Sequence, residues 1–404
     1  MKHIILIGDG MSDNPIETLG GLTPLDYAAT PNLDLLAGTG RFGLFASVPQ
    51  GYAPGSDVAN LSILGYDPAK YYRGRAPLEA ASIGVKLGAN DTAFRCNLVT
   101  LSGGGGPKVM VDYSAGHIST EEAREIISDL DNHLKGRGVR FYPGTAYRHL
   151  MVWEDAPEGL YKKLKTTPPH DISDKEISGH LPEGEGAEKL RELIELSWEI
   201  LSAHPVNRKR EAEGKRPATS IWLWGQGVAP ELPTLKERFG VDGAIISAVD
   251  LMKGIGVYAG LEVINVPGIT GYIDTNYKGK VEYALKALKD GKDFICVHVE
   301  APDEAGHQGR LDDKLKAIED FDSEIVGAML AGLSGEEFTL LALTDHPTPV
   351  ELKTHTSDAV PFAQCTSEEL KTKRGNAKFS EKEAGETGIL VDDCEVFMEE
   401  FFGG

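Results

Sequence analysis

Three short, mostly apolar runs, each followed by an acidic residue, constrain the fold of this chain more than any other feature. They cover residues 4–7, 294–299 and 338–343, and they lead into Asp9, Asp303 and Asp345. Uninterrupted apolar runs of this length are typical of strands buried on both faces of a sheet. A helical pattern over residues 314–333 separates the last two runs. Strands that alternate with helices predict an α/β fold, with a mainly parallel sheet and helices on both faces.

The region between residues 91 and 170 has a different pattern. Ser119-Thr120-Glu121-Glu122 is a capping-box sequence that predicts the start of a helix. Gly103 to Gly106 favours a hairpin turn. Strand-like stretches surround this helix at residues 93–101, 107–113 and 147–153. We therefore predict a small inserted α+β domain that carries substrate contacts or acts as a lid.

We place the boundaries of this insertion at residues 89–177. The proline-rich stretch 167–185 is expected to mark its end, because its prolines break any regular element. A long helix over 188–203 and a strand over 220–224 are expected to return the chain to the α/β core. On this interpretation residues 1–88 and 178–404 form the core domain.

The charge balance restricts the partners. The net charge is −21, from 62 acidic and 41 basic residues, so nucleic acid and anionic membrane surfaces would be repelled. A small anionic metabolite could still bind if cations line its site. Four widely spaced cysteines form no CxxC pair and favour a reducing, cytoplasmic setting. No apolar stretch approaches the ~20 residues of a membrane span.

The acidic residues and nearby histidines predict a metal site. Sites in open α/β sheets form at the carboxyl ends of strands, so these residues are expected to converge. Carboxylates and imidazoles together suit Mn²⁺ or Zn²⁺ better than Mg²⁺. Asp303 and His307 are four residues apart and would share a helix face. The adjacent Asp345 and His346 could both be ligands only in an irregular loop. The candidate ligands are Asp9, Asp303, His307, Asp345, His346 and His355.

Ser56 is the candidate nucleophile. It follows Pro54-Gly55 at the start of a predicted helix, where the helix dipole favours phosphate oxygens. A divalent metal would activate the hydroxyl by stabilising its alkoxide. The alternative is that Ser56 only caps the helix.

At this point five motifs resemble those of a known family. In chain order they are Gly8-Asp9-Gly10-Met11, Gly55-Ser56-Asp57-Val58-Ala59-Asn60, Ala301-Pro302-Asp303-Glu304-Ala305-Gly306-His307, Thr344-Asp345-His346 and Thr354-His355-Thr356-Ser357-Asp358. They resemble the alkaline phosphatase superfamily and, more narrowly, the archaeal-type cofactor-independent phosphoglycerate mutases. The resemblance covers nearly the whole chain. It implies an alkaline phosphatase-like core with two divalent metal ions.

The resemblance also implies roles for single residues. One metal would be held by Asp9, Ser56, Asp345 and His346, and the other by Asp303, His307 and His355. Ser56 would form a phosphoserine and return the phosphate to the other hydroxyl of the reoriented glycerate. Candidate substrate contacts are Arg73, Arg75, Arg95, Arg148, His149 and Lys253.

Three functions remain open on the sequence. The first is a metal-dependent isomerase that interconverts 2- and 3-phosphoglycerate without 2,3-bisphosphoglycerate. The second keeps the same site but acts as a phosphatase or a homoserine kinase-like phosphotransferase, because the short branch of the family, with Gly-Ser-Asp at the nucleophile, also resembles such proteins. The third is a metal-binding protein without turnover, although every candidate ligand is present.

Overall fold

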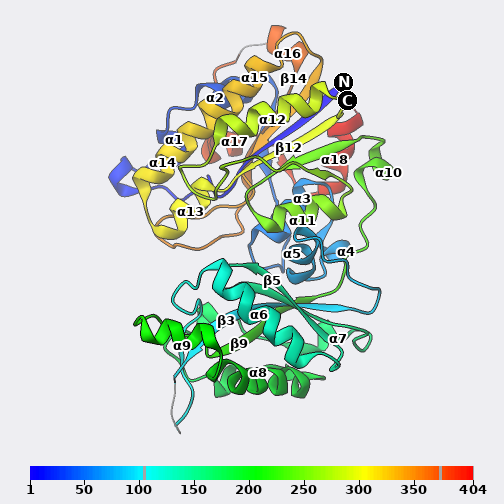
Figure 1. Cartoon of the computed structure of the whole chain (residues 1–404). Coiled ribbons are helices and arrows are strands. Elements are labelled where there is room, and N and C mark those ends of the chain that lie inside the picture. Colours follow the sequence, from blue (N-terminus) through cyan, green and yellow to red (C-terminus); the bar gives the residue numbers. More distant parts are fainter. Residues whose placement is uncertain (103–105, 373–374, 404) are drawn as a thin grey trace. The chain divides into compact units, whose positions relative to one another are not determined.

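The computed structural model describes residues 1–102, 106–372 and 375–403 of the chain. Two compact units make up the chain, Met1–Tyr72 with Glu231–Gly404, and Arg73–Pro230 (Figure 1). The second unit begins earlier and ends later than the insertion predicted at residues 89–177. Its two ends are joined, because the backbone N–H of Val228 donates to the carbonyl of Arg73 over 3.1 Å.

The first unit contains an eight-stranded sheet with three of the predicted runs at its centre. The strand order is β11-β10-β12-β1-β13-β14-β2-β15, and β1 pairs in parallel with both β12 and β13. Only β14 is antiparallel to its neighbours. The strands span Lys2–Gly8 (β1), Arg41–Phe45 (β2), Gly243–Ile246 (β10), Glu262–Val263 (β11), Phe294–Val299 (β12), Phe338–Leu343 (β13), Val360–Thr366 (β14) and Leu390–Val391 (β15).

Helices cover both faces of this sheet. On one face, Ile295 of β12 shares a hydrophobic cluster with Ala284 of α12 (Tyr277–Lys289). On the other, the Phe294 ring meets Phe402 of α18 (Cys394–Gly403), with centroids 5.4 Å apart. Neighbouring strand residues therefore face opposite helix layers, and this is why the strands carry no polar alternation. The predicted mainly parallel α/β fold class is confirmed.

The segments that follow the central strands position the site. Helix α13 (Ala301–Gln308) begins directly after β12, and α14 (Leu311–Asp320) follows it. The helical stretch predicted over 314–333 continues from α14 through a π-helical segment (Phe321–Gly327) into α15 (Ala328–Gly332). Helix α3 (Ser56–Ile63) begins at the candidate nucleophile. Other helices of this unit are α1 (Pro24–Tyr27), α2 (Pro31–Thr39), α4 (Pro68–Tyr71), α10 (Leu235–Phe239), α11 (Asp250–Tyr258), α16 (Ser367–Thr372) and α17 (Glu381–Glu386).

The second unit is an α+β unit built on a five-stranded antiparallel sheet. Strand β3 (Thr92–Leu101) pairs with β4 (Met110–Asp112), β6 (Arg148–Trp153) and β9 (Ser220–Gly227), and β5 (Val139–Thr145) pairs with β6. The predicted capping box at Ser119 is present and starts α6 (Thr120–Leu134). The hairpin turn predicted at 103–106 lies mostly outside the described residues. The unit also contains α5 (Ala76–Ser82), α7 (Leu160–Lys163), β7 (Leu164–Lys165), β8 (Glu183–Gly184) and α9 (Pro205–Ala212).

Two predicted elements belong to a different unit than expected. Helix α8 (Ala187–Ser202) and strand β9 were expected in the core domain, and both lie in the second unit. Strand β9 pairs with β3, and Leu223 of β9 shares a hydrophobic cluster with Leu190 of α8. The proline-rich stretch before α8 is therefore a connection inside the second unit, not its boundary. In the described part of the chain, no helix combines the length and apolarity needed to cross a membrane.

Candidate active site

Three acidic side chains meet where the central strands of the first unit end. Asp9 follows β1, Asp345 follows β13 and Asp303 lies in the first turn of α13. Because β12, β1 and β13 are adjacent and parallel, their carboxyl ends lie at one edge of the sheet. The backbone N–H of Gly10 donates to Asp345 Oδ1 over 3.0 Å and ties two of these ends together.

A first group of possible metal ligands consists of Asp9, Asp345 and His346. One ligand atom from each lies within 4.8 Å of the others, and all three residues are buried. His346 Nε2 is 3.4 Å from Asp345 Oδ2 and 3.7 Å from Asp9 Oδ1. The loop after β13 is irregular, and Asp345 Oδ1 accepts a hydrogen bond from the backbone N–H of His346. The irregular loop required for two adjacent ligands is therefore present.

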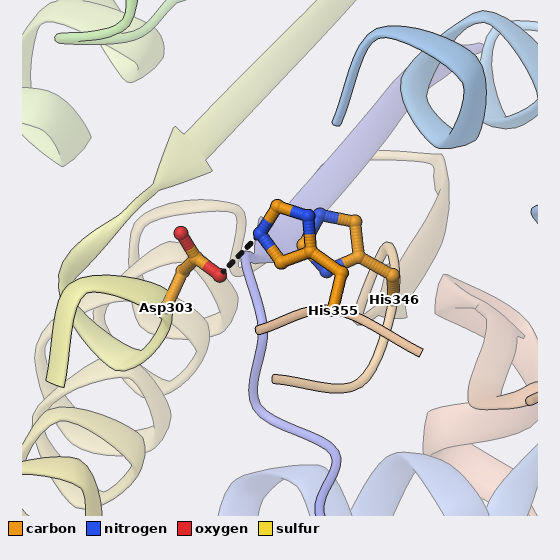
Figure 2. Close-up of side chains that lie close together, drawn as sticks. All are labelled: Asp303, His346 and His355. Carbon is orange, nitrogen blue, oxygen red and sulfur yellow. Dashed lines mark ion pairs between the residues drawn. The ribbon is translucent and has the colours of Figure 1, made fainter. Parts of the chain in front are cut away.

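A second group consists of Asp303, His346 and His355, and Figure 2 shows the Asp303 carboxylate facing the His355 imidazole. Asp303 Oδ1 is 3.3 Å from His355 Nε2, and Asp303 Oδ2 is 3.3 Å from His307 Nε2. The two facing nitrogens, Nε2 of His307 and Nε2 of His355, are 2.8 Å apart. The ring of His346 lies 4.0 Å from that of His355, so His346 belongs to both groups and joins them.

Ser56 lies beside these groups. It is the first residue of α3, and Gly55 occupies the N-cap position, so Ser56 is not the cap. Its Oγ is 3.1 Å from His346 Nε2. One turn later, the Asn60 side-chain amide donates to the Ser56 carbonyl and to Asp345 Oδ2, each over 2.9 Å. Asn60 therefore fixes the start of α3 against the first ligand group.

The electrostatics of both groups fit divalent cations. Asp9 Oδ1 is buried without a hydrogen-bond partner, and burial together with the carboxylates of Asp345 and Asp303 raises the pKa of Asp9 well above its ordinary value. Burial would lower the pKa of His307, but its hydrogen bond and ion pair with Asp303 raise it to about 9. A cation would satisfy the orphaned oxygen, reduce the repulsion between carboxylates and separate the facing imidazole nitrogens.

His298 is a site residue that the sequence reasoning missed. Its Nε2 lies 3.1 Å from Asp9 Oδ2, and its Nδ1 lies 3.2 Å from the hydroxyl of Ser247. Burial lowers the pKa of His298 to about 4, so the ring is neutral near pH 7, and its Nε2 is buried beside Asp9 without a hydrogen-bond partner in the described part of the chain. A histidine inside the otherwise apolar run 294–299 was the available signal.

The candidate substrate contacts are divided between the two units. Arg75 and Arg95 both pair with Glu79, over 3.2 and 2.9 Å, and the Arg95 guanidinium lies 4.0 Å from the Trp224 ring centroid. Arg148 lies close enough to Arg95 to help depress its pKa, which burial lowers to about 10. Two of the six predicted contacts therefore share the Glu79 carboxylate, and a third, Arg148, lies near Arg95.

The other three predicted contacts are Arg73, His149 and Lys253. The backbone carbonyl of Arg73 accepts the hydrogen bond from Val228 that joins the two ends of the second unit. His149 is buried, its Nδ1 accepts the backbone N–H of Gly144 over 3.0 Å, and its Nε2 has no hydrogen-bond partner among the described residues. Lys253 belongs to α11 of the first unit and pairs with Asp250 over 3.3 Å.

This fold and site define an α/β protein with a mainly parallel sheet and a serine beside two joined groups of candidate metal ligands. Residues 37–207 match the family described as 2,3-bisphosphoglycerate-independent phosphoglycerate mutase. A protein named as a probable member, from Geobacter sulfurreducens, is 54% identical over 400 residues, covering 99% of both chains. A named member from Methanosarcina acetivorans is 58% identical over 365 residues, covering 90% of each. The chain belongs to the family of 2,3-bisphosphoglycerate-independent phosphoglycerate mutases.

Solved structures agree with this assignment. The cofactor-independent phosphoglycerate mutase from Thermoplasma acidophilum superposes with a TM-score of 0.65 at 25% identity, covering all of both chains. A Pyrococcus horikoshii protein superposes with a TM-score of 0.80 at 31% identity, covering 100% of this chain and 97% of that one. The likeness therefore extends over both units of the chain.

Proposed function

We propose that this protein interconverts 2- and 3-phosphoglycerate through a phosphoserine on Ser56, without 2,3-bisphosphoglycerate. The observation that carries the proposal is the 3.1 Å distance between Ser56 Oγ and His346 Nε2, because His346 belongs to both ligand groups. A phosphoryl group attached to Ser56 would lie directly beside both groups. Family membership supports phosphoglycerate as the substrate.

The chain's residues would act in two transfers. Ser56 loses its proton and its Oγ forms a bond to phosphorus as the bond to the substrate oxygen breaks, and that oxygen takes up a proton. The glycerate then turns, its other hydroxyl loses a proton and bonds to the same phosphorus as the phosphorus–Oγ bond breaks, and Ser56 Oγ takes up a proton. Two divalent cations, held by Asp9, Asp345 and His346 and by Asp303, His307 and His355, would neutralise phosphate oxygens and lower the pKa of the serine hydroxyl.

Mn²⁺ is the cation we favour. Both ligand groups combine carboxylate oxygen with imidazole nitrogen, a mixture that suits Mn²⁺, Zn²⁺ or Co²⁺ better than Mg²⁺. Substrate carboxylate and phosphate oxygens would be bound by arginines of the second unit, of which Arg75, Arg95 and Arg148 are the grouped candidates. Nucleic acid and membrane remain unsuitable partners for a chain of charge −21. Four free, buried cysteines are consistent with a cytoplasmic protein.

The proposal is tested by ³¹P NMR of the metal-stripped protein with 3-phosphoglycerate, before and after addition of Mn²⁺ and without bisphosphoglycerate. We expect 2-phosphoglycerate to appear only with metal, and Ser56→Ala to abolish it. Release of free phosphate alone would instead identify a phosphatase. If nothing changes, ATP with homoserine tests the kinase-like alternative.

A further inference from the structure

A buried lysine outside the ligand groups connects the segments that carry them. Lys314 lies on α14, and its side chain is 0% exposed. Its ammonium donates to the carbonyls of Ser12 and Thr348, over 3.1 and 2.9 Å, and to Asp13 Oδ2 over 2.8 Å. Three acceptors satisfy all three N–H groups of a lysine. One side chain therefore links the loop after β1, the loop after β13 and the helix that follows α13.

Two of the linked segments carry candidate metal ligands, and the third directly follows a helix that does. The loop after β1 begins with Asp9, the loop after β13 contains Asp345 and His346, and α13, which precedes α14, carries Asp303 and His307. A displacement of any linked segment would therefore change the distances within both ligand groups.

Thr348 contacts both Lys314 and two of the candidate ligands. While its carbonyl accepts from Lys314, its hydroxyl donates to Asp303 Oδ1 over 2.5 Å and lies 3.3 Å from His346 Nδ1. Its backbone N–H donates to the Ser12 carbonyl over 3.1 Å. A single residue, Thr348, therefore connects Lys314 to the carboxylate of Asp303 and to the imidazole of His346, which both groups share.

The charge of Lys314 is paired directly with Asp13, which is not a candidate ligand. Asp13 Oδ2 also accepts the backbone N–H of Val350 over 3.0 Å, so the carboxylate is held between Lys314 and the loop after β13. On its other side, the backbone N–H of Asp13 donates to Glu381 Oε1 over 3.1 Å. The ion pair with Asp13 is therefore the direct contact of the Lys314 charge, and Asp303 interacts with that charge from a greater distance.

We propose that Lys314, together with Asp13, is a positioning residue that holds the two ligand groups at the separation required for metal binding. It contacts neither the reacting atoms nor the cations. The inference rests on the proposed metal-dependent function, but it concerns metal affinity and not substrate. Side chains that orient metal ligands from outside typically change metal affinity 10- to 100-fold when they are removed.

The test uses the full, metal-stripped chain and titrates Mn²⁺ while the free ion is followed by electron paramagnetic resonance. The variant Lys314→Met/Asp13→Asn removes both charges and leaves no buried unpaired ion. The matched control is Lys316→Met, two residues away on α14, because Lys316 is exposed and pairs only with Asp320 among its recorded contacts. Unfolding of each metal-stripped protein is followed by circular dichroism.

We expect the double variant to unfold cooperatively and to bind Mn²⁺ about 10- to 100-fold more weakly, while the control binds like the wild type. An unchanged Mn²⁺ affinity in the folded double variant would overturn the inference. If the double variant does not fold, the Mn²⁺ titration is repeated with Lys314→Arg, because arginine keeps the charge but cannot match the three acceptor positions. Wild-type-like Mn²⁺ binding by Lys314→Arg would overturn the inference, and weakened binding would support it. If these differences in Mn²⁺ affinity are found but the wild-type protein has no mutase activity, only the proposed function is refuted.

Discussion

Gly10 is the position where the geometry of the site gives the sharpest prediction. Its φ is +64°, in the left-handed region, and a Cβ at this position would lie 2.7 Å from both the Asp303 Cα and the Thr348 Oγ1. Real Cβ atoms do not approach other atoms this closely, so the first turn of α13 would have to move. Because Gly10 also donates to Asp345, the change would disturb both ligand groups.

A matched control separates the two contributions to the loss of stability, the left-handed backbone conformation and the steric overlap of the new Cβ. Gly20 has a similar φ of +72°, but a Cβ there would meet nothing within 4 Å. Gly20→Ala should therefore cost only the left-handed conformation, about 1–2 kcal/mol. Gly10→Ala should cost this amount plus overpacking of about 1–3 kcal/mol. The loss at Gly10 is thus about 2–5 kcal/mol, a large part of the about 5–15 kcal/mol that stabilises a typical domain.

Urea denaturation of the two metal-stripped variants measures the difference. We expect the free energy of unfolding of Gly10→Ala to lie about 1–3 kcal/mol below that of Gly20→Ala, because only the overpacking differs. Mn²⁺ affinity should fall in Gly10→Ala alone. Equal losses of stability in the two variants would refute the reasoning, because they would mean that the close approach to Asp303 and Thr348 carries no cost.

Three further predictions concern other parts of the first unit. Asn60→Ala should weaken Mn²⁺ binding about 10-fold, measured by titration of the metal-stripped protein, because Asp345 loses a hydrogen bond; an unchanged affinity would contradict this. Mn²⁺ binding near pH 7 should release protons, because the pKa of His307 is about 9 and a histidine ligand must be neutral. Calorimetry in buffers of different ionisation enthalpy measures the proton release, and binding heats that do not depend on the buffer would refute the prediction. His3 is buried against Phe401, and burial lowers its pKa below 6.5. The free energy of unfolding should therefore fall as the pH drops below 6.5, by at most about 2 kcal/mol at pH 5. His3→Phe should remove this part of the acid sensitivity in thermal unfolding, and equal acid sensitivity in both proteins would contradict the prediction.

The centre of the first unit was predictable because its strands are apolar on both faces. Residues 294–299 and 338–343 coincide with β12 and β13, and the acidic residues after them converge as expected. Parallel strands place their carboxyl ends together whatever the loops contain, so convergence needs no knowledge of the loops.

The unit boundary was not predictable by the same means. Local pattern identified the strand now seen as β9, but a strand pattern does not say which sheet a strand joins. Leu223 of β9 pairs with Cys96 of β3, and a local pattern carries no information on a pairing between residues so far apart in the sequence. Lys314 was missed for a related reason, because a lysine is normally exposed. Its place on the helix face of Ala317 and Ile318, three and four residues later, was the overlooked signal.

The hydrogen bond between Arg73 and Val228 has a consequence for how the chain could be divided. The second unit leaves the first and returns to it through segments joined by one backbone contact, so a short linker could replace residues 73–230. Such a shortened chain would keep Ser56 and every candidate metal ligand and would lose the arginine cluster around Glu79. Under the proposed function, cation binding and substrate selection would then be separable properties of two pieces of protein, each open to alteration without rebuilding the other.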